Sequence, residues 1–148
     1  MGYRRLFIMR KDLNMSPGKL AAQVGHCAEA YWTQLFRIFQ NHADATMIGD
    51  KLIQFPIVLD VDVLENYVND RFVKTICEAR NRNHLLKARD MALELGLVEC
   101  HSFGLIRDAC LTELEPEEED GTTITGIWFA PLPDDVAHTI SKKYQLYR

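Results

Sequence analysis

The chain has 148 residues, of which 47% are hydrophobic and 26% charged, and its formal net charge is −4. This composition is ordinary for a single globular domain. The negative net charge argues against a protein that coats nucleic acid without sequence preference, but it is compatible with nucleic-acid binding through a local basic patch. Without a run of roughly 20 apolar residues or the long apolar stretch of a signal peptide, we expect a cytoplasmic protein with no membrane contact.

The first predicted unit is a strand, a loop and a helix. Residues 3–9 form a short apolar run that predicts a strand, and residues 10–15 form the turn that follows it. Ser16 is suited to cap a helix and Pro17 to occupy its first position, and helical spacing of apolar residues continues to Phe39. The loop and the helix start therefore lie at the carboxyl end of a strand, where ligands gather in open α/β sheets.

Three polar residues, Lys19, Gln23 and His26, follow one line along this predicted helix. A cation, an amide and an imidazole near a helix N-terminus suit an anionic, hydrogen-bonding ligand. From spacing alone, a solvated stripe on an amphipathic helix is the simpler interpretation. A second face, with Leu20, Val24, Cys27 and Tyr31, is assigned to the core.

The middle of the chain predicts an irregular insertion at about 52–70, with a short strand or hairpin in it. Asp60 and Asp62 within it could be metal ligands, but no third ligand is clustered with them. We therefore interpret them as the exposed residues of a strand in which exposed and buried positions alternate. The next predicted elements are a strand over 72–77 and a helix over 80–95, which Gly96 helps to end.

The last third predicts a strand over 98–106, an acidic loop over 113–121, a strand over 124–129 and a helix from Pro133 to Ile140. The order β-α-β-α-β-β-α, with the insertion at 52–70, gives a single α/β domain (residues 1–148) with a mixed four-stranded sheet and helices on both faces.

The four cysteines do not suggest a disulfide framework or a zinc site, because no pair has C-x-x-C spacing. We interpret Cys27, Cys77, Cys100 and Cys110 as buried thiols in a reducing compartment. His101 beside Cys100 is the nearest approach to a metal-binding cluster, and no metal or organic cofactor is expected.

Several stretches of the sequence resemble the second class of peptidyl-tRNA hydrolases, found in archaea and eukaryotes. The first block is LFIMRKDLNMSPGKLAAQVGHCA at 6–28, which is similar to the signature of that family. The resemblance resumes from about Phe72 and continues through ALELGL at 92–97 and LIRDACLTELEP at 105–116, and it ends with YQLY at 144–147. It covers nearly the whole chain apart from about 52–70.

The resemblance implies a hydrolase that cleaves the ester between a peptide, or an N-blocked amino acid, and tRNA, and that acts as a homodimer. We expect the dimer interface to include part of the aromatic stripe of the helix over 31–39, or the strand at Trp128 and Phe129. The catalytic residues of the family fall on Lys19, Gln23, His26, Asp108 and Thr112. Within this scheme Asp108 orients or deprotonates water, which requires a raised pKa or a proton shuttle because an ordinary aspartate is a weak base. For His26, a packed core histidine and a proton carrier are both open.

The anionic substrate is expected to bind a local basic patch. Its candidates are Arg4, Arg5, Arg10, Lys11 and Lys19 near the first loop, with Lys87 and Arg107 as further members. We expect both Arg10 and Lys11 to be exposed. A salt dependence corresponding to roughly two to four phosphates is predicted.

The chain departs from the family pattern at several positions, among them the Gly-Pro after the last strand, which is replaced by WFAP at 128–131. Cys110 and Leu111 stand where the family has a glycine and a basic residue, and Glu78 stands near the position of a lysine. A catalytically weak relative that binds RNA or protein, and a hydrolase of a different ester or amide, are therefore kept as alternatives. Covalent catalysis by Cys110 is a further alternative, although no histidine is near it in sequence.

Overall fold

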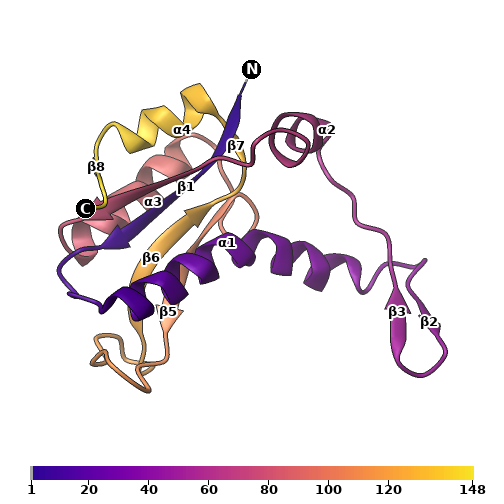
Figure 1. Ribbon diagram of the computed structural model, residues 1–148, viewed down its shortest axis with the longest axis horizontal. Coiled ribbons are helices and arrows are strands. Elements are labelled where there is room, and N and C mark those ends of the chain that lie inside the picture. The colour runs from indigo at the N-terminus through magenta and orange to yellow at the C-terminus, as the bar shows by residue number, and fades with distance from the viewer. Residues whose placement is uncertain (1) are drawn as a thin grey trace.

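A computed structural model describes residues 2–148 of the chain, and Figure 1 shows its architecture. The elements are, in chain order, β1 (Tyr3–Arg10), α1 (Pro17–Phe39), β2 (Thr46–Ile48), β3 (Leu52–Gln54), α2 (Val61–Val63), the π-helical turn η1 (Leu64–Val68), β4 (Lys74–Ala79), α3 (Arg82–Glu94), β5 (Phe103–Asp108), β6 (Thr123–Phe129), β7 (Leu132–Pro133), α4 (Asp134–Ser141) and β8 (Gln145–Leu146).

The main sheet is mixed, with the strand order β5-β6-β1-β4-β8. Strand β1 runs parallel to β4 and antiparallel to β6, and the predicted four strands lie side by side. The sheet is larger than predicted, because β8 pairs with β4 and β7 pairs with the start of β1. Both additional strands have two residues, too few to leave an alternating pattern in the sequence.

Helices cover both faces of the sheet, as predicted. In Figure 1, α1 crosses one face, and α3 and α4 lie on the other. The core under α1 contains Phe7, Met9, Cys27 and Trp128, and the larger core on the opposite face includes Leu6 and Ile8. Because successive side chains of a strand point to opposite faces, β1 supplies residues to both cores in alternation.

Helix α1 begins as the sequence predicts. Ser16 accepts a hydrogen bond from the Lys19 backbone N–H at 3.4 Å, and Pro17 is the first helical residue. The fully buried Arg5 of β1 then fixes the helix to the sheet by donating to the backbone oxygens of Cys27, at 2.9 Å, and Ala28, at 2.7 Å. Burial lowers the pKa of Arg5 to about 10, so the guanidinium stays charged at neutral pH.

The insertion forms an arm, which we define as residues 36–73. In Figure 1 the end of α1 and the β2–β3 hairpin project away from the sheet. A hairpin is present as predicted, but it spans 46–54 and so begins ahead of the expected range. The assignment of Asp60 and Asp62 to a strand is wrong, because the Asp60 side chain accepts from the Asp62 N–H at 2.7 Å and caps α2.

Two predicted strands begin later than expected because of left-handed residues. Phe72 has φ of 40°, and β4 starts after it; Cys100 has φ of 69° within a turn that ends before β5. The predicted end of α3 is correct: Gly96, at φ of 80°, donates to the Leu93 oxygen, and Leu97 donates to the Ala92 oxygen. This pair of bonds is the Schellman arrangement that stops a helix. Within residues 2–148, none of the helices has the length and apolar character needed to cross a membrane.

Candidate active site

The centre of the site is an ion pair between the first turn of α1 and the end of β5. Lys19 Nζ lies 2.7 Å from Asp108 Oδ1 and 3.3 Å from Thr112 Oγ1. The two charged side chains are only 15% and 10% exposed. The structure thus brings Lys19 together with two residues that stand 89 and 93 positions farther along the chain, as the resemblance implied.

Gln23 lies one turn along α1 and is 1% exposed. Its Nε2 donates to Asp108 Oδ1 at 3.3 Å, and its Oε1 accepts from Thr125 Oγ1 at 2.6 Å. Because the Thr125 hydroxyl donates to the oxygen of the Gln23 amide, the nitrogen of that amide is directed toward the Asp108 carboxylate. Sequence reasoning missed Thr125, although a hydroxyl between apolar residues of a buried strand is the kind of signal that reveals such a contact.

Asp108 is held in its ionised form. Burial opposes ionisation, but the hydrogen bond from Lys19, the backbone N–H of Cys110 at 3.0 Å and the amide of Gln23 together lower the pKa of Asp108 below its ordinary value. A carboxylate with a lowered pKa is a poorer base than a free aspartate. The raised pKa that the base role of Asp108 required is therefore absent, and its geometry suits orientation of a water molecule and of Lys19.

The loop that follows Asp108 carries the departures from the family pattern. Cys110 has φ of 59°, a conformation that glycine adopts without strain, and its thiol donates back to the Asp108 backbone oxygen at 3.5 Å. Leu111 is 88% exposed and contributes no cation. No histidine hydrogen-bonds the Cys110 thiol within residues 2–148, so the activated pair that covalent catalysis needs is not assembled there.

The acidic loop of residues 113–121 fastens the site together. Glu113 accepts from the backbone N–H and the hydroxyl of Ser16, at 2.7 and 2.6 Å, and so ties the start of α1 to the Asp108 loop. Farther along, Glu118 pairs with Arg82 at 2.7 Å. The run of carboxylates is thus used in internal contacts, which the sequence alone did not indicate.

Arg10 is buried, and the prediction that it is exposed is wrong. Its side chain is 2% exposed and donates to the carboxylates of Asp12 and Glu117 and to the backbone oxygen of Ile124. These contacts occupy the guanidinium and raise its pKa, despite the opposing effect of burial. Arg10 therefore supports the loop and does not offer a free cation to a phosphate.

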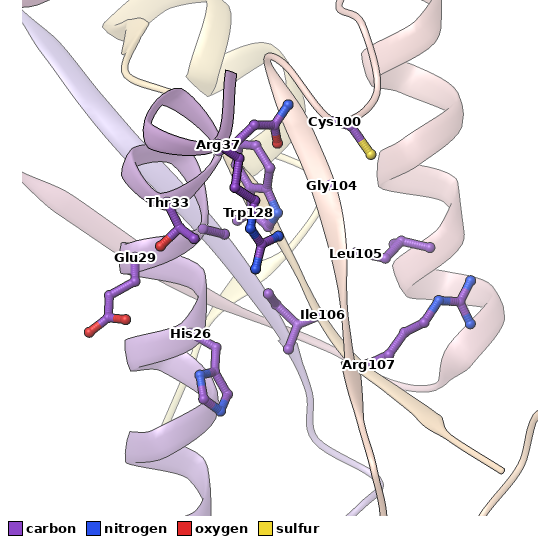
Figure 2. Close-up of a pocket in the computed structure, with 12 residues that line it drawn as sticks. His26, Glu29, Thr33, Arg37, Cys100, Gly104, Leu105, Ile106, Arg107 and Trp128 are labelled. Carbon is purple, nitrogen blue, oxygen red and sulfur yellow. The ribbon is translucent and has the colours of Figure 1, made fainter. Parts of the chain in front are cut away.

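His26 is separate from the Lys19–Asp108 pair. It is exposed, which excludes the packed core histidine, and it lies at one end of a groove of about 550 Å³ between α1 and β5. Figure 2 shows His26, Glu29, Thr33 and Arg37 along α1, with Trp128 and Ile106 between the helix and β5. Its lining includes Arg107, the residue before Asp108, but none of Lys19, Gln23, Asp108 and Thr112.

The other predicted substrate-binding residues do not form one patch. Lys11 is exposed, lies 4.4 Å from the centre of the Tyr147 ring and donates to the Arg148 backbone oxygen. Arg107 is exposed on β5, where Figure 2 shows it directed away from α1. Lys87 is exposed on α3, on the opposite face of the sheet from α1.

A metal site is not formed by the side chains that the structure describes. In residues 2–148, His, Cys, Asp and Glu residues nowhere gather in a group of three or more that could hold a metal ion. The cysteines are free thiols, with Cys27 and Cys77 buried as predicted, whereas Cys100 is exposed and Cys110 half-buried. Burial raises the pKa of Cys27 to about 12, so this thiol is inert.

Comparison with known proteins places relatives along almost the full length of the chain. The sequence model of a family described as "Peptidyl-tRNA hydrolase PTH2" matches residues 3–147. Proteins named peptidyl-tRNA hydrolase are similar to this chain: one from Methanopyrus kandleri is 30% identical, covering 99% of both chains, and one from Thermococcus sibiricus is 27% identical, covering 97% of both. A solved structure of a protein of unknown function from Agrobacterium tumefaciens is also similar, with a TM-score of 0.55 over 100% of this chain and 99% of that chain. The two sequences are 11% identical, so this similarity shows the fold alone.

Proposed function

The chain belongs to the peptidyl-tRNA hydrolase PTH2 family, and we propose that it hydrolyses the ester bond between a peptide, or an N-blocked amino acid, and the terminal ribose of tRNA. One observation carries the proposal: Lys19, Gln23, Asp108 and Thr112 meet at the carboxyl end of the sheet. Cleavage would recycle tRNA for translation, which supports a cytoplasmic location.

The reaction adds water to the ester carbonyl carbon, forms a tetrahedral oxyanion and then breaks the bond to the ribose oxygen. The water loses one proton and the ribose oxygen gains one. Lys19 is the cation placed to stabilise the oxyanion, and such groups typically contribute about 2.7–4 kcal/mol to lowering the barrier. Asp108 and Thr112 position Lys19 and the attacking water, and Gln23 keeps Asp108 in place.

The proton leaves the attacking water by a route other than full transfer to Asp108, since its carboxylate is held as the anion. His26 is the nearest histidine along the helix line of Lys19 and Gln23, and it is exposed to the groove. An imidazole has one nitrogen that accepts a proton and one that donates it, which suits a proton carrier between solvent and site. A His26→Ala variant with full activity at all pH values would contradict this role.

For the RNA half of the substrate we propose a C-terminal basic surface, defined as Arg80, Lys87, Lys142 and Lys143. All four are exposed, they form no ion pair within residues 2–148, and they line two adjoining cavities of about 250 and 380 Å³. In Figure 1 the start of α3 and β8 lie on the same side of the molecule as the carboxyl end of β1. This surface replaces the patch that the sequence suggested around Arg10.

The salt dependence of RNA binding tests the basic surface. For an acceptor-stem RNA, the slope of log affinity against log salt should correspond to roughly two to four phosphates. The double variant Lys142→Ala/Lys143→Ala should reduce that slope by about one for each phosphate that the protein no longer neutralises. A control with the same charge change, Lys51→Ala/Arg71→Ala on the arm, should leave the slope unchanged. An equal effect of both double variants would contradict the assignment.

We also propose that the chain forms a homodimer through the arm. Of the 18 large hydrophobic residues that are exposed within residues 2–148, 13 lie in the arm. Exposed apolar surface of this extent is unusual on a monomer and marks an interaction surface. The alternative interface at Trp128 and Phe129 is wrong, because both are buried inside the chain, at 4% and 0% exposure. Light scattering should report twice the 17.0 kDa chain mass, and Met47→Lys/Ile53→Lys should lower it.

The decisive assay for the function is release of free tRNA from N-acetyl-aminoacyl-tRNA by the purified protein. Turnover that depends on Lys19 supports the proposal. RNA binding without turnover would instead favour the alternative of a catalytically weak RNA-binding relative, and turnover of other esters alone would favour a different hydrolase.

A further inference from the structure

Strand β5 has an open edge beside the candidate active site. It is the last strand in the order β5-β6-β1-β4-β8, and within residues 2–148 its outer side is bridged only at Phe103, to Glu99, so the edge is open from Leu105 onward. The Ser102 oxygen accepts from the Ala130 N–H of the β6 side, whereas the Phe103 oxygen accepts from the Cys100 N–H on the outer side. Because backbone groups alternate along an antiparallel pair, the N–H and C=O of Leu105 face the open edge.

The groove of Figure 2 runs along this edge. Its floor includes Gly104 and Trp128, and α1 forms its wall. At Gly104 a Cβ atom would lie 2.6 Å from Trp128 Nε1, so the ring lies directly against the strand. The strand ends at Asp108, three residues beyond Leu105, and therefore leads from the groove to the ion pair with Lys19.

We propose that the peptide half of the substrate binds as an added strand along the open edge of β5, which rests on the proposed function. The ester must lie at Asp108, so the peptide runs parallel to β5 with its carboxyl end toward that residue. At about 3.3 Å per residue, Leu105 lies about 10 Å from the ester and meets the third or fourth residue before it. Main-chain hydrogen bonds are common to all peptides, which suits a substrate without a fixed sequence.

The groove is lined by charges of both signs. Glu29 carries an exposed carboxylate there, and Arg37 and Arg107 are exposed cations of the same lining. The unpaired cations of the C-terminal basic surface lie elsewhere, so the two halves of the substrate extend in different directions from Lys19.

A series of substrates tests the inference with the natural protein. The value of kcat/KM for tRNA release should rise as the peptide lengthens from one to about four residues and then stay constant. An N-methyl group on the residue that donates to the Leu105 oxygen should lower kcat/KM by about 2- to 12-fold, the effect of one hydrogen bond. A constant kcat/KM across peptide lengths, or no effect of N-methylation at any position, would overturn the inference.

A matched pair of variants tests the edge itself. Leu105→Pro removes the outward N–H, a change that edge strands tolerate, whereas Leu105→Ala shortens the side chain and keeps the N–H. Leu105→Pro should lower the ratio of kcat/KM for a tetrapeptidyl substrate to that for an N-acetyl-aminoacyl substrate, and Leu105→Ala should preserve the ratio. An unchanged ratio in the folded proline variant overturns the inference and leaves the proposed function standing. No release from any substrate by the natural protein overturns both.

Discussion

The hydroxyl of Thr125 has a specific role that the substitution Thr125→Val tests. Thr125 is fully buried, and its Oγ1 donates to Gln23 Oε1 at 2.6 Å. Valine has nearly the same shape but leaves the buried amide oxygen without a donor, which costs about 1–3 kcal/mol of unfolding free energy. For a domain of this size the loss corresponds to a lowering of Tm by about 2–4 °C for each kcal/mol.

The same substitution should affect catalysis more than stability alone explains. Once Thr125 no longer restrains the amide, Gln23 can rotate and its Nε2 ceases to donate to Asp108. A hydrogen bond to a charged group contributes about 1.5–3 kcal/mol, so kcat/KM should fall by about tenfold or more.

Thr123→Val provides the control for this experiment. Thr123 is also fully buried, and its hydroxyl donates to the Glu115 oxygen at 2.6 Å and accepts from the Glu117 N–H at 3.0 Å, away from Gln23. Urea denaturation should show a similar loss of unfolding free energy for both variants. In the tRNA-release assay, Thr125→Val should lose more kcat/KM than Thr123→Val. If Thr125→Val retains the kcat/KM of the unsubstituted protein, the argument for Gln23 fails.

The remaining predictions concern the loop, the ion pair and the buried arginine. Cys110→Gly removes the strain of a left-handed residue and should raise the free energy of unfolding by about 0.5–1 kcal/mol, whereas Cys110→Ala should give no gain; a loss in the glycine variant in urea denaturation would contradict the strain argument. The folded pKa of Asp108 lies below its unfolded value, so its stabilisation is present above the unfolded pKa of about 3.9 and is lost as the pH falls through the folded pKa. The stability difference between the natural protein and Asp108→Asn should therefore be constant from about pH 5 to 7 and narrow at pH 3, and a difference that widens on acidification would refute this sign. Arg10→Glu should destabilise the protein by about 3 kcal/mol or more, because it places a carboxylate beside Asp12 and Glu117, and Lys11→Glu should have little effect; equal urea midpoints would contradict the burial of Arg10.

The sequence was informative where a local pattern determines the structure. The cap at Ser16 and the glycine at Gly96 marked helix ends, because capping depends on a few neighbouring residues. The late starts of β4 and β5 were missed, since the left-handed conformations of Phe72 and Cys100 result from the surrounding fold and not from residue type.

The candidate site was predictable only through the resemblance, and its supports were not. Lys19 and Gln23 share a helix line, but nothing local places Asp108 next to them. The burial of Arg10 depends on Glu117, which is 107 positions away, so composition and spacing treated it as an exposed cation. Contacts at such separations arise from strand order, which a single sequence does not display.

Release of tRNA by a Lys19 variant tests the central claim most directly. The assay compares kcat/KM for N-acetyl-aminoacyl-tRNA between the natural protein, Lys19→Ala and Lys51→Ala, a lysine in the turn of the β2–β3 hairpin with the same charge change. We predict that Lys19→Ala loses about 100- to 1,000-fold in kcat/KM and that Lys51→Ala matches the natural protein. Turnover by a folded Lys19→Ala variant within a few-fold of the natural protein would contradict the assignment of the active site.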